Sequence, residues 1–135
     1  MTDEQLIAAA ISTRQRAYAP YSKFLVGAAL LTEDGQVFTG CNVENISYGL
    51  SLCAERSAVV SAIAAGVTSF IALAVVADTT NPISPCGACR QVLAEFTPSL
   101  RIVSSNLQGQ FETFSLQNLL PRAKTGILEV PPNTD

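Results

Sequence analysis

The sequence predicts a three-layer α/β/α fold with a mixed central sheet of about five strands. Residues 70–77 form an almost unbroken apolar run, which is typical of a strand covered by helices on both faces. Two β-rich runs, 24–31 and 37–42, flank the pair Asp34-Gly35, which favours an antiparallel hairpin. Helical patterns precede, separate and follow these runs, so the sheet is expected to lie between two helix layers.

The first element is a helix. Thr2 and Gln5 have the spacing of a capping box, and apolar residues recur at helical spacing after them. Pro20 interrupts this pattern, so the helix is expected to end near Tyr18.

Two further helices are expected before and after the strand at 70–77. Residues 54–65 are mostly small and apolar, which predicts a helix that is buried on most faces. Gly66 stands where the end of that helix needs a left-handed residue. A polar turn at 78–84 then leads into a helix over 86–96.

The C-terminal part continues the alternation. Residues 101–104 indicate a strand, 106–110 a turn, and 115–120 a short helix that Pro121 ends. The tail from Val130 contains two prolines and is expected to be loosely held. No internal repeat or linker interrupts the pattern, so residues 1–135 are expected to form a single domain.

Composition limits the classes of function. Only 14% of the residues are charged, so part of the surface is expected to be buried between subunits. The net charge is −3 and the Lys and Arg residues are scattered, which argues against nucleic acid and anionic membranes as partners. The acidic N-terminus lacks the features of a secretory signal, and no apolar run is long enough to span a membrane. We therefore expect a cytoplasmic protein.

The cysteines carry most of the functional information. In a reducing compartment, the four cysteines are expected to be metal ligands, catalytic groups or free thiols and not disulfides. The chain has no histidine, so it lacks the commonest alternative metal ligand and the commonest general base. Three of the cysteines lie in two clusters, 53–56 (Cys-Ala-Glu-Arg) and 85–90 (Pro-Cys-Gly-Ala-Cys-Arg), each at the N-terminus of a predicted helix. The dipole there favours the thiolate form, so three sulfurs can face one zinc ion while Glu55 lies beside an open fourth position. These ligands are Cys53, Cys86 and Cys89.

Charge balance adds a second requirement. Three thiolates outweigh the charge of Zn²⁺, which weakens the ion as a Lewis acid. We expect Arg56 to draw charge away by donating hydrogen bonds to the sulfurs, and Arg90 is a second candidate for this role.

The cysteine pattern is also compatible with sites that are not catalytic zinc centres. A Cys-x-x-Cys pair is typical of redox pairs and structural zinc knuckles as well. The strongest alternative is a closed site of four cysteines with Cys41 as the last ligand, which would make the protein a non-enzymatic, zinc-stabilised interaction module. Strand alternation argues against it: if Asn42 faces a pocket, Cys41 points to the opposite side of the strand.

Four segments together closely resemble the small homotetrameric cytidine deaminases. They are Tyr18-Ala-Pro-Tyr-Ser-Lys-Phe24, Gly40-Cys-Asn-Val-Glu-Asn45, Cys53-Ala-Glu-Arg56 and Ser84-Pro-Cys-Gly-Ala-Cys-Arg-Gln91. The resemblance implies a cytidine deaminase-like fold, a homotetramer and one zinc ion per chain. It also implies hydrolytic deamination of cytidine and 2′-deoxycytidine, with release of ammonia, in pyrimidine salvage.

The resemblance also implies the residues that perform the chemistry. Cys53, Cys86 and Cys89 would hold zinc, which lowers the pKa of a water molecule. Glu55 would carry the proton of this water to the pyrimidine ring and then to the departing amine.

The same resemblance implies a nucleoside-binding set. Asn42 and Glu44 would bind the ribose 3′-hydroxyl, Phe24 would pack against the base, and the main chain at Ala54 would meet the pyrimidine edge. A carboxylate beside the sugar repels a 5′-phosphate, so free nucleosides are favoured over nucleotides. Related deaminases act on blasticidin S, but Tyr48 after the Asn-Val-Glu segment favours cytidine.

One departure from the family lies near the C-terminus. The family commonly places a phenylalanine shortly after the Leu-Leu-Pro segment at 119–121, where it reaches the active site of a neighbouring subunit. This chain continues Arg122-Ala123-Lys124 instead. The aromatic contact is therefore missing at this position.

Overall fold

A five-stranded mixed sheet forms the middle layer of the computed structural model, which describes residues 1–125 and Leu128. Its strands lie in the order β2-β1-β3-β4-β5; β3 and β4 are parallel, and all other neighbours are antiparallel. They are β1 (Val26–Thr32), β2 (Val37–Cys41), β3 (Phe70–Ala77), β4 (Arg101–Ser105) and β5 (Phe111–Ser115). The helices are α1 (Asp3–Arg14), the 3₁₀ helix η1 (Tyr48–Leu50), α2 (Ala54–Ala64), α3 (Gly87–Phe96) and α4 (Leu116–Leu119).

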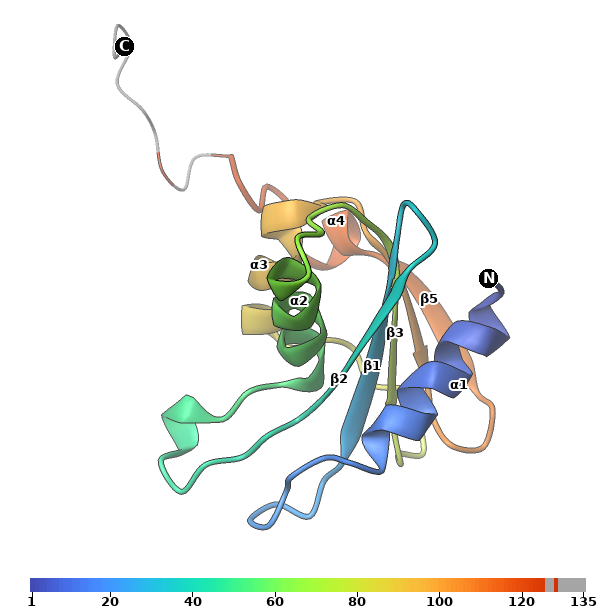
Figure 1. The fold of residues 1–135 in the computed structure, drawn as a ribbon, viewed down its shortest axis with the longest axis vertical. Helices are drawn as coiled ribbons and strands as arrows, with labels where there is room; N and C mark the ends of the chain where they lie inside the picture. The colour runs from blue at the N-terminus through green and yellow to red at the C-terminus, as the bar shows by residue number, and fades with distance from the viewer. Residues whose placement is uncertain (126–127, 129–135) are drawn as a thin grey trace, which may run out of the picture.

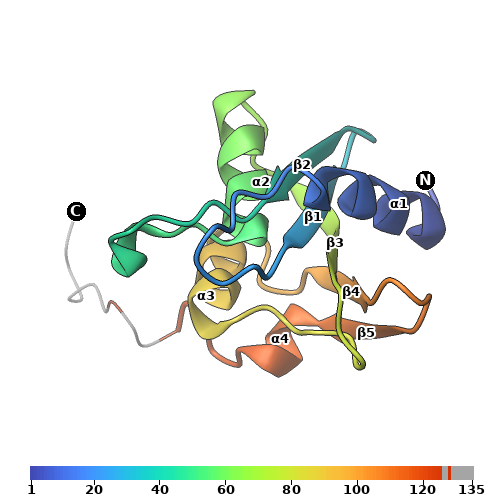
Figure 2. The ribbon, with the colours of Figure 1, turned by 90° about the horizontal axis from the view of Figure 1, so that it is seen from below.

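The three predicted layers are confirmed. The helix α1 covers one face of the sheet, and α2, α3 and α4 cover the other (Figures 1 and 2). The segment between β2 and α2, which carries η1, extends away from these layers in both views. Within the described residues, no helix is both long enough and apolar enough to cross a membrane.

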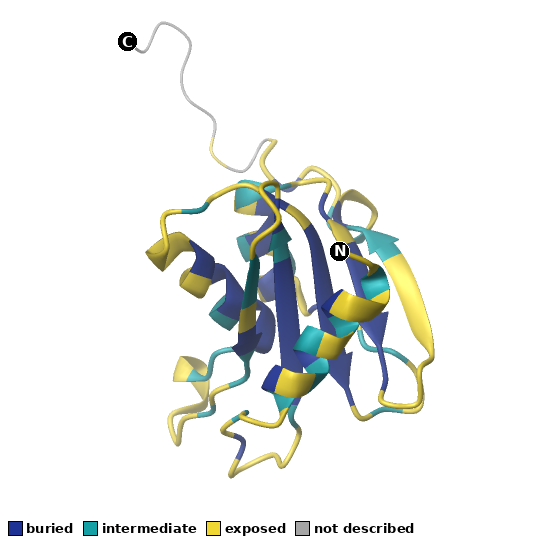
Figure 3. Ribbon diagram, turned by 45° about the vertical axis from the view of Figure 1, so that its right-hand side comes forward, coloured by how far each residue is buried: buried dark blue, intermediate teal, exposed yellow. Residues whose placement is uncertain are grey.

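Apolar side chains pack on both faces of the sheet. Leu73 and Val75 of β3 belong to the larger cluster beneath α2 and α3, whereas Ala74 and Val76 belong to the smaller cluster beneath α1. Figure 3 shows the buried inner strands between the helix layers. The apolar run of this strand is therefore covered on both sides, as predicted.

The strand β5 is the element that the sequence patterns did not locate. It pairs antiparallel with β4 at the edge of the sheet, and its first three residues are exposed (Figure 3). Its side chains contribute little to the core, so it carries only a weak apolar signal. The short helix after it begins at Leu116 and ends at Leu119, close to the predicted range.

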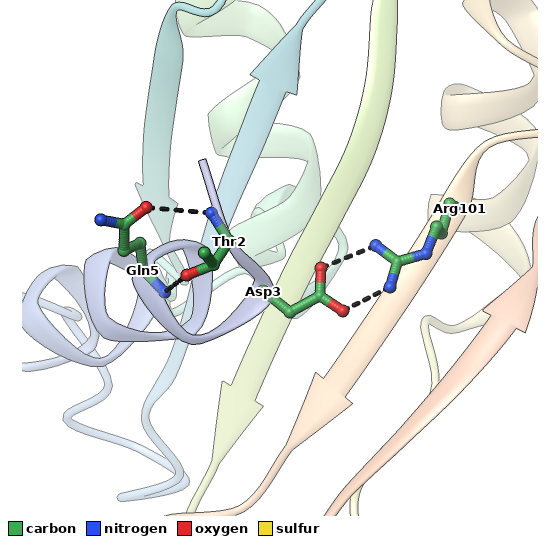
Figure 4. Close-up of polar contacts among 4 residues, drawn as sticks. All are labelled: Thr2, Asp3, Gln5 and Arg101. Carbon is green, nitrogen blue, oxygen red and sulfur yellow. Dashed lines mark hydrogen bonds and ion pairs between the residues drawn. The ribbon is translucent and has the colours of Figure 1, made fainter.

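The helix α1 begins as predicted and ends earlier than predicted. The Thr2 side chain accepts a hydrogen bond from the Gln5 N–H, and the Gln5 side chain accepts one from the Thr2 N–H (Figure 4). The helix ends at Arg14 because Tyr18 pairs with the chain beyond β2, where its N–H donates to the Asn42 carbonyl over 2.9 Å. Tertiary pairing therefore overrides the local helical pattern.

Two glycines let the helices lie directly on the sheet. A Cβ at Gly40 of β2 would stand 2.3 Å from the Ala58 nitrogen of α2. A Cβ at Gly27 of β1 would stand 2.0 Å from the Ala10 carbonyl oxygen of α1. Because a side chain cannot fit in either place, these contacts fix the distance of α2 and α1 from the sheet.

The helix α2 differs in one respect from its prediction. Gly66 has the expected left-handed conformation, with φ of 84°. The face of α2 that carries Val60 and Ile63 is exposed in the single chain, however, so the helix is not buried on most faces. The tail predicted to be loosely held, from Val130 onward, lies outside the described residues.

Candidate metal centre

The three clustered cysteines meet where the N-termini of α2 and α3 lie side by side (Figure 2). Cys53 is the N-cap residue of α2, Cys86 is the N-cap residue of α3, and Cys89 lies on the first turn of α3. Their three Sγ atoms all lie within 4.8 Å of one another. The predicted convergence of these sulfurs is therefore confirmed.

This donor set fits zinc. Cys86 and Cys89 Sγ are 3.4 Å apart, and neither N-cap cysteine uses its side chain to cap its own helix, so the sulfurs stay available for a shared ion. Among the described residues, neither Cys41 nor a carboxylate joins the group. The alternative of four cysteines around one ion is therefore wrong.

Arg56 supplies positive charge to the sulfur cluster. Its Nη2 atom donates to Cys53 Sγ over 3.1 Å, as the sequence predicted. A hydrogen bond from Cys89, together with Arg56, lowers the pKa of the Cys53 thiol to about 5. The bond to Cys53 raises the pKa of Arg56, and sharing a proton with Cys53 raises the pKa of Cys89. The surroundings of Cys53 thus favour its thiolate form, which is the form that binds a metal.

Arg90 does not share this role. In the described part of the chain, its guanidinium donates to oxygen atoms of Ser84, Pro85 and Leu119 and to none of the sulfurs. The interpretation of Arg90 as a second donor to the cluster is therefore wrong.

Glu55 lies next to the sulfurs and inside the protein. Only 4% of the residue is exposed, and burial raises the pKa of its carboxyl group to about 6. A carboxyl group with a pKa this close to neutral can both accept and release a proton at physiological pH.

A cavity of about 240 Å³ connects these groups with several predicted substrate contacts. Phe24, Asn42 and Ala54 line it together with Cys53, Cys86 and Glu55. Val26, Ile83 and Ser84 also line it and were not predicted as site residues. The position of Ser84 directly before the Pro-Cys-x-x-Cys motif is the one sequence signal that points to it.

Asn42 and Glu44 do not line the same cavity. Glu44 lies in a neighbouring cavity of about 330 Å³ with Tyr21, Ser22, Tyr48 and Ser51. One of its oxygens accepts from the main-chain N–H groups of Tyr21 and Ser22 over 3.0 and 3.1 Å, and the other accepts from the Ser22 hydroxyl. These bonds lower the pKa of the Glu44 carboxyl group, the Ser22 hydroxyl contributing most. Glu44 therefore holds the loop that precedes Phe24.

Asn42 is held by the main chain on both sides of its amide. Its Oδ1 atom accepts from the Val26 N–H and its Nδ2 atom donates to the Phe24 carbonyl, each over 2.8 Å. A primary amide offers two donor hydrogens and two acceptor positions, so one of each stays available.

Zinc bound by three sulfurs with an open fourth position is a catalytic arrangement, because structural zinc sites are closed by four protein ligands. A buried carboxyl group lines the same cavity and can carry protons. Together the fold and the site define the class of zinc-dependent hydrolytic enzymes.

Comparison with known proteins identifies the family within this class. Residues 1–105 match the family model of the cytidine and deoxycytidylate deaminase zinc-binding region. The cytidine deaminase of Sporosarcina psychrophila is 55% identical over 124 residues, which cover 91% of either chain. That of Halalkalibacterium halodurans is 51% identical and covers 93% of this chain and 96% of its own.

Solved structures agree with the sequence comparison. The crystal structure of cytidine deaminase from Burkholderia pseudomallei superposes with a TM-score of 0.87 at 57% identity, over 90% of this chain and 98% of that one. The chain belongs to the cytidine and deoxycytidylate deaminase family, and Cys53, Cys86 and Cys89 are its zinc-binding triad.

Proposed function

We propose that the protein hydrolyses cytidine and 2′-deoxycytidine to uridine and 2′-deoxyuridine, with release of ammonia, as a step of pyrimidine salvage. Membership of the deaminase family and the names of its relatives support this activity. The structural observation that carries the proposal is Glu55, a buried carboxyl group with raised pKa that lines the same cavity as the zinc ligands Cys53 and Cys86.

Glu55 is the proton carrier in this proposal. Zinc at the cysteine triad supplies Lewis-acid activation, which lowers the pKa of a water molecule toward neutrality. The Glu55 carboxylate accepts the proton that this water gives up and delivers it to ring nitrogen N3 as C4 is attacked. Glu55 then takes the remaining proton from the hydroxyl group now on C4 and gives it to the 4-amino nitrogen, which leaves as ammonia while the C4 carbonyl forms. Burial suits Glu55 to this task because it brings the pKa of the carboxyl group close to neutrality.

Arg56 tunes the charge of the site. Its hydrogen bond to Cys53 spreads part of the thiolate charge onto the guanidinium, which leaves the metal more electron-poor. The N-termini of α2 and α3 act in the same direction. Arg56 therefore supports catalysis without touching the substrate.

The nucleoside is bound by residues of the cavity that Glu55 lines and by Glu44 of the adjacent cavity. Phe24 packs against the base and the main chain at Ala54 meets the pyrimidine edge, since both residues line the cavity that holds Glu55. The unused donor and acceptor of Asn42, together with Glu44 next to it, bind the ribose 3′-hydroxyl. The lowered pKa of Glu44 keeps a negative charge there, which disfavours a 5′-phosphate.

A homotetramer is the assembly that the exposed apolar surface supports. Ile46, Tyr48 and Leu50 are 81%, 75% and 71% exposed on the projecting segment around η1, and Val60 and Ile63 are exposed on α2. Apolar side chains gathered in this way are typical of subunit interfaces. Light scattering on the purified protein measures the mass directly, and a monomer in solution would contradict this part of the proposal. We also place the protein in the cytoplasm, where its four free cysteines stay reduced.

The decisive experiment follows the ultraviolet absorbance of cytidine mixed with the zinc-loaded protein. We expect loss of the 4-aminopyrimidine absorbance, release of ammonia and arrest of the reaction by a zinc chelator. Cytidine 5′-monophosphate serves as the matched control and should be a much poorer substrate. If zinc-loaded, folded protein turned over no cytosine nucleoside, the proposed function would be refuted.

A further inference from the structure

We propose that Arg90 is a positioning residue that holds one corner of the zinc site in place by joining it to the end of α4. The corner consists of residues 82–86, which connect the polar turn after β3 to α3. It carries the zinc ligand Cys86, and Ser84 of the corner lines the substrate cavity. The inference deepens the proposed function, on which its kinetic part rests.

The contacts of the Arg90 guanidinium carry the argument. Nε donates to the Pro85 carbonyl over 2.7 Å, and Nη2 donates to the Ser84 hydroxyl over 3.2 Å. Nη1 donates to the Leu119 carbonyl over 3.0 Å. All three nitrogens of one planar group are therefore engaged, two with the corner and one with α4.

The corner has little else to hold it. Residues 82–86 belong to no helix or strand. In the described structure, the two bonds from Arg90 are the only hydrogen bonds to polar groups of residues 82–85. Cys86 is bound through its carbonyl, and the donor is again Arg90, through its main-chain N–H over 2.9 Å. Apart from the contact between Cys86 Sγ and Cys89 Sγ, Arg90 thus accounts for the hydrogen bonds that anchor residues 82–86 in the described structure.

The other end of the link is itself fixed. The chain after Leu119 is tied to α3 by Gln91, whose Nε2 donates to the Ala123 carbonyl over 3.0 Å. Lys124 adds a second tie, from its Nζ to the Glu95 carbonyl over 3.2 Å. The chain that follows the Leu119 carbonyl is therefore held against α3 independently of Arg90, and the guanidinium joins the corner to this anchored part of the chain.

A lysine cannot replace this bridge. Its single ammonium group lacks the planar fork that reaches three separate oxygens in fixed directions. Without the fork, the corner loses at least part of its anchoring, and both Cys86 and the Ser84 wall of the cavity become free to shift. Loss of such support for a metal ligand typically lowers metal affinity by about 10–100-fold.

The test compares Arg90→Lys with the matched control Gln91→Met. The control removes the hydrogen bond from Gln91 to the Ala123 carbonyl in the chain after α4 and leaves the hydrogen bonds of the corner in place. Zinc affinity is measured by competition with a chromophoric chelator, and the ligand geometry is read from the absorption bands of the Co²⁺-loaded protein. We expect Arg90→Lys to lose about 10–100-fold in zinc affinity, to shift the Co²⁺ bands and to raise KM for cytidine. Gln91→Met should keep the wild-type affinity and spectrum.

Wild-type zinc affinity and an unchanged Co²⁺ spectrum in Arg90→Lys would overturn the inference. Equal losses in both variants would also overturn it, because they would assign the effect to anchoring of the C-terminal chain. If Arg90→Lys does not fold, Ser84→Ala removes one of the three bonds and leaves the arginine in place. A smaller loss of zinc affinity then supports the inference and an unchanged affinity overturns it. These readouts need no substrate, so they stay distinct from a failure of cytidine turnover.

Discussion

The N-terminus of α1 and the N-termini of α2 and α3 use the same helix position for opposite purposes. At α1 the N-cap residue is Thr2, whose side chain accepts a hydrogen bond from the Gln5 main chain (Figure 4). At α2 and α3 the N-cap residues are Cys53 and Cys86, whose side chains make no capping bond. The first helix thus satisfies the N–H groups of Thr2 and Gln5 with its own side chains, while the other two helices leave their positive ends beside the sulfurs.

The difference shows how the protein divides stability and function. Giving up a side-chain cap costs about 1 kcal/mol of helix stability. Binding zinc through cysteines contributes on the order of 10 kcal/mol in small zinc domains, far more than two missing caps cost. The uncapped ends are therefore stable in the metal-loaded protein, and the capped end needs no ligand.

The largest effect is expected from removing a sulfur at an uncapped end. Cys53→Ala should lose its zinc and its turnover, and its melting temperature should no longer rise when zinc is added, because two sulfurs hold the ion poorly. Metal analysis and thermal unfolding with and without zinc measure this. Cys41→Ser is the matched control, since Cys41 lies outside the sulfur cluster. Zinc loss in this control would show that the cluster has a fourth ligand.

The next effect separates the proton carrier from the metal site. Glu55→Gln keeps the size of the side chain but cannot carry a proton, so turnover should fall by about 10²–10⁴-fold. Zinc content and melting temperature should stay near those of the wild type, because Glu55 is not one of the clustered ligands. Retention of full turnover by the zinc-loaded variant would assign proton transfer to another group.

At the capped end, the expected effect is on stability alone. Thr2→Ala removes the side-chain acceptor for the Gln5 N–H and should lower the free energy of unfolding by about 1 kcal/mol. Urea denaturation measures the loss, and Thr2→Ser should restore most of it. Zinc content and turnover should not change in either variant. A drop in zinc affinity would mean that the two ends are coupled.

The smallest effect is expected at the ion pair beside this cap. The Asp3 carboxylate accepts two hydrogen bonds from the guanidinium of Arg101 in β4, one of them over 2.7 Å (Figure 4). Both side chains are partly exposed. Arg101 holds the pKa of Asp3 below its usual value of 3.8. The Asp3 carboxylate therefore stabilises the fold at pH values above 3.8, and this contribution is lost as the pH falls through the lowered pKa. Asp3→Asn should therefore cost less than about 1 kcal/mol at neutral pH.

Urea denaturation of the wild type and Asp3→Asn at neutral pH and again below about pH 3 checks this sign. The difference in unfolding free energy should shrink toward zero at the acidic pH. A difference that grew on acidification would contradict the assignment.

The metal centre could be predicted from the sequence because its parts are local. Each cysteine cluster lies at the start of a helix whose pattern is clear, so the direction of the sulfurs follows from helix geometry. Arg56 lies one turn beyond Cys53, and its contact follows from the same geometry. Glu55 was likewise predicted beside the sulfurs, although its degree of burial depends on packing that no local pattern encodes.

The features that were not predicted depend on tertiary contacts. The strand β5 exists through pairing with β4, and its exposed side chains give no strong periodicity. The early end of α1 depends on Tyr18 pairing beyond β2. The role of Arg90 depends on Leu119, which is distant in sequence, so the motif alone suggested the nearby sulfurs. The placement of Glu44 depends likewise on how the loop at Ser22 folds around its carboxylate.

Gly40 has a consequence for how this enzyme can evolve. With its Cβ position already filled by the main chain of α2, any other residue there would lift the helix that carries a zinc ligand off the sheet. Substitutions at this contact between β2 and α2 are therefore not tolerated. New substrate preferences have to arise in the loops that line the cavity, such as those bearing Phe24 and Ile83.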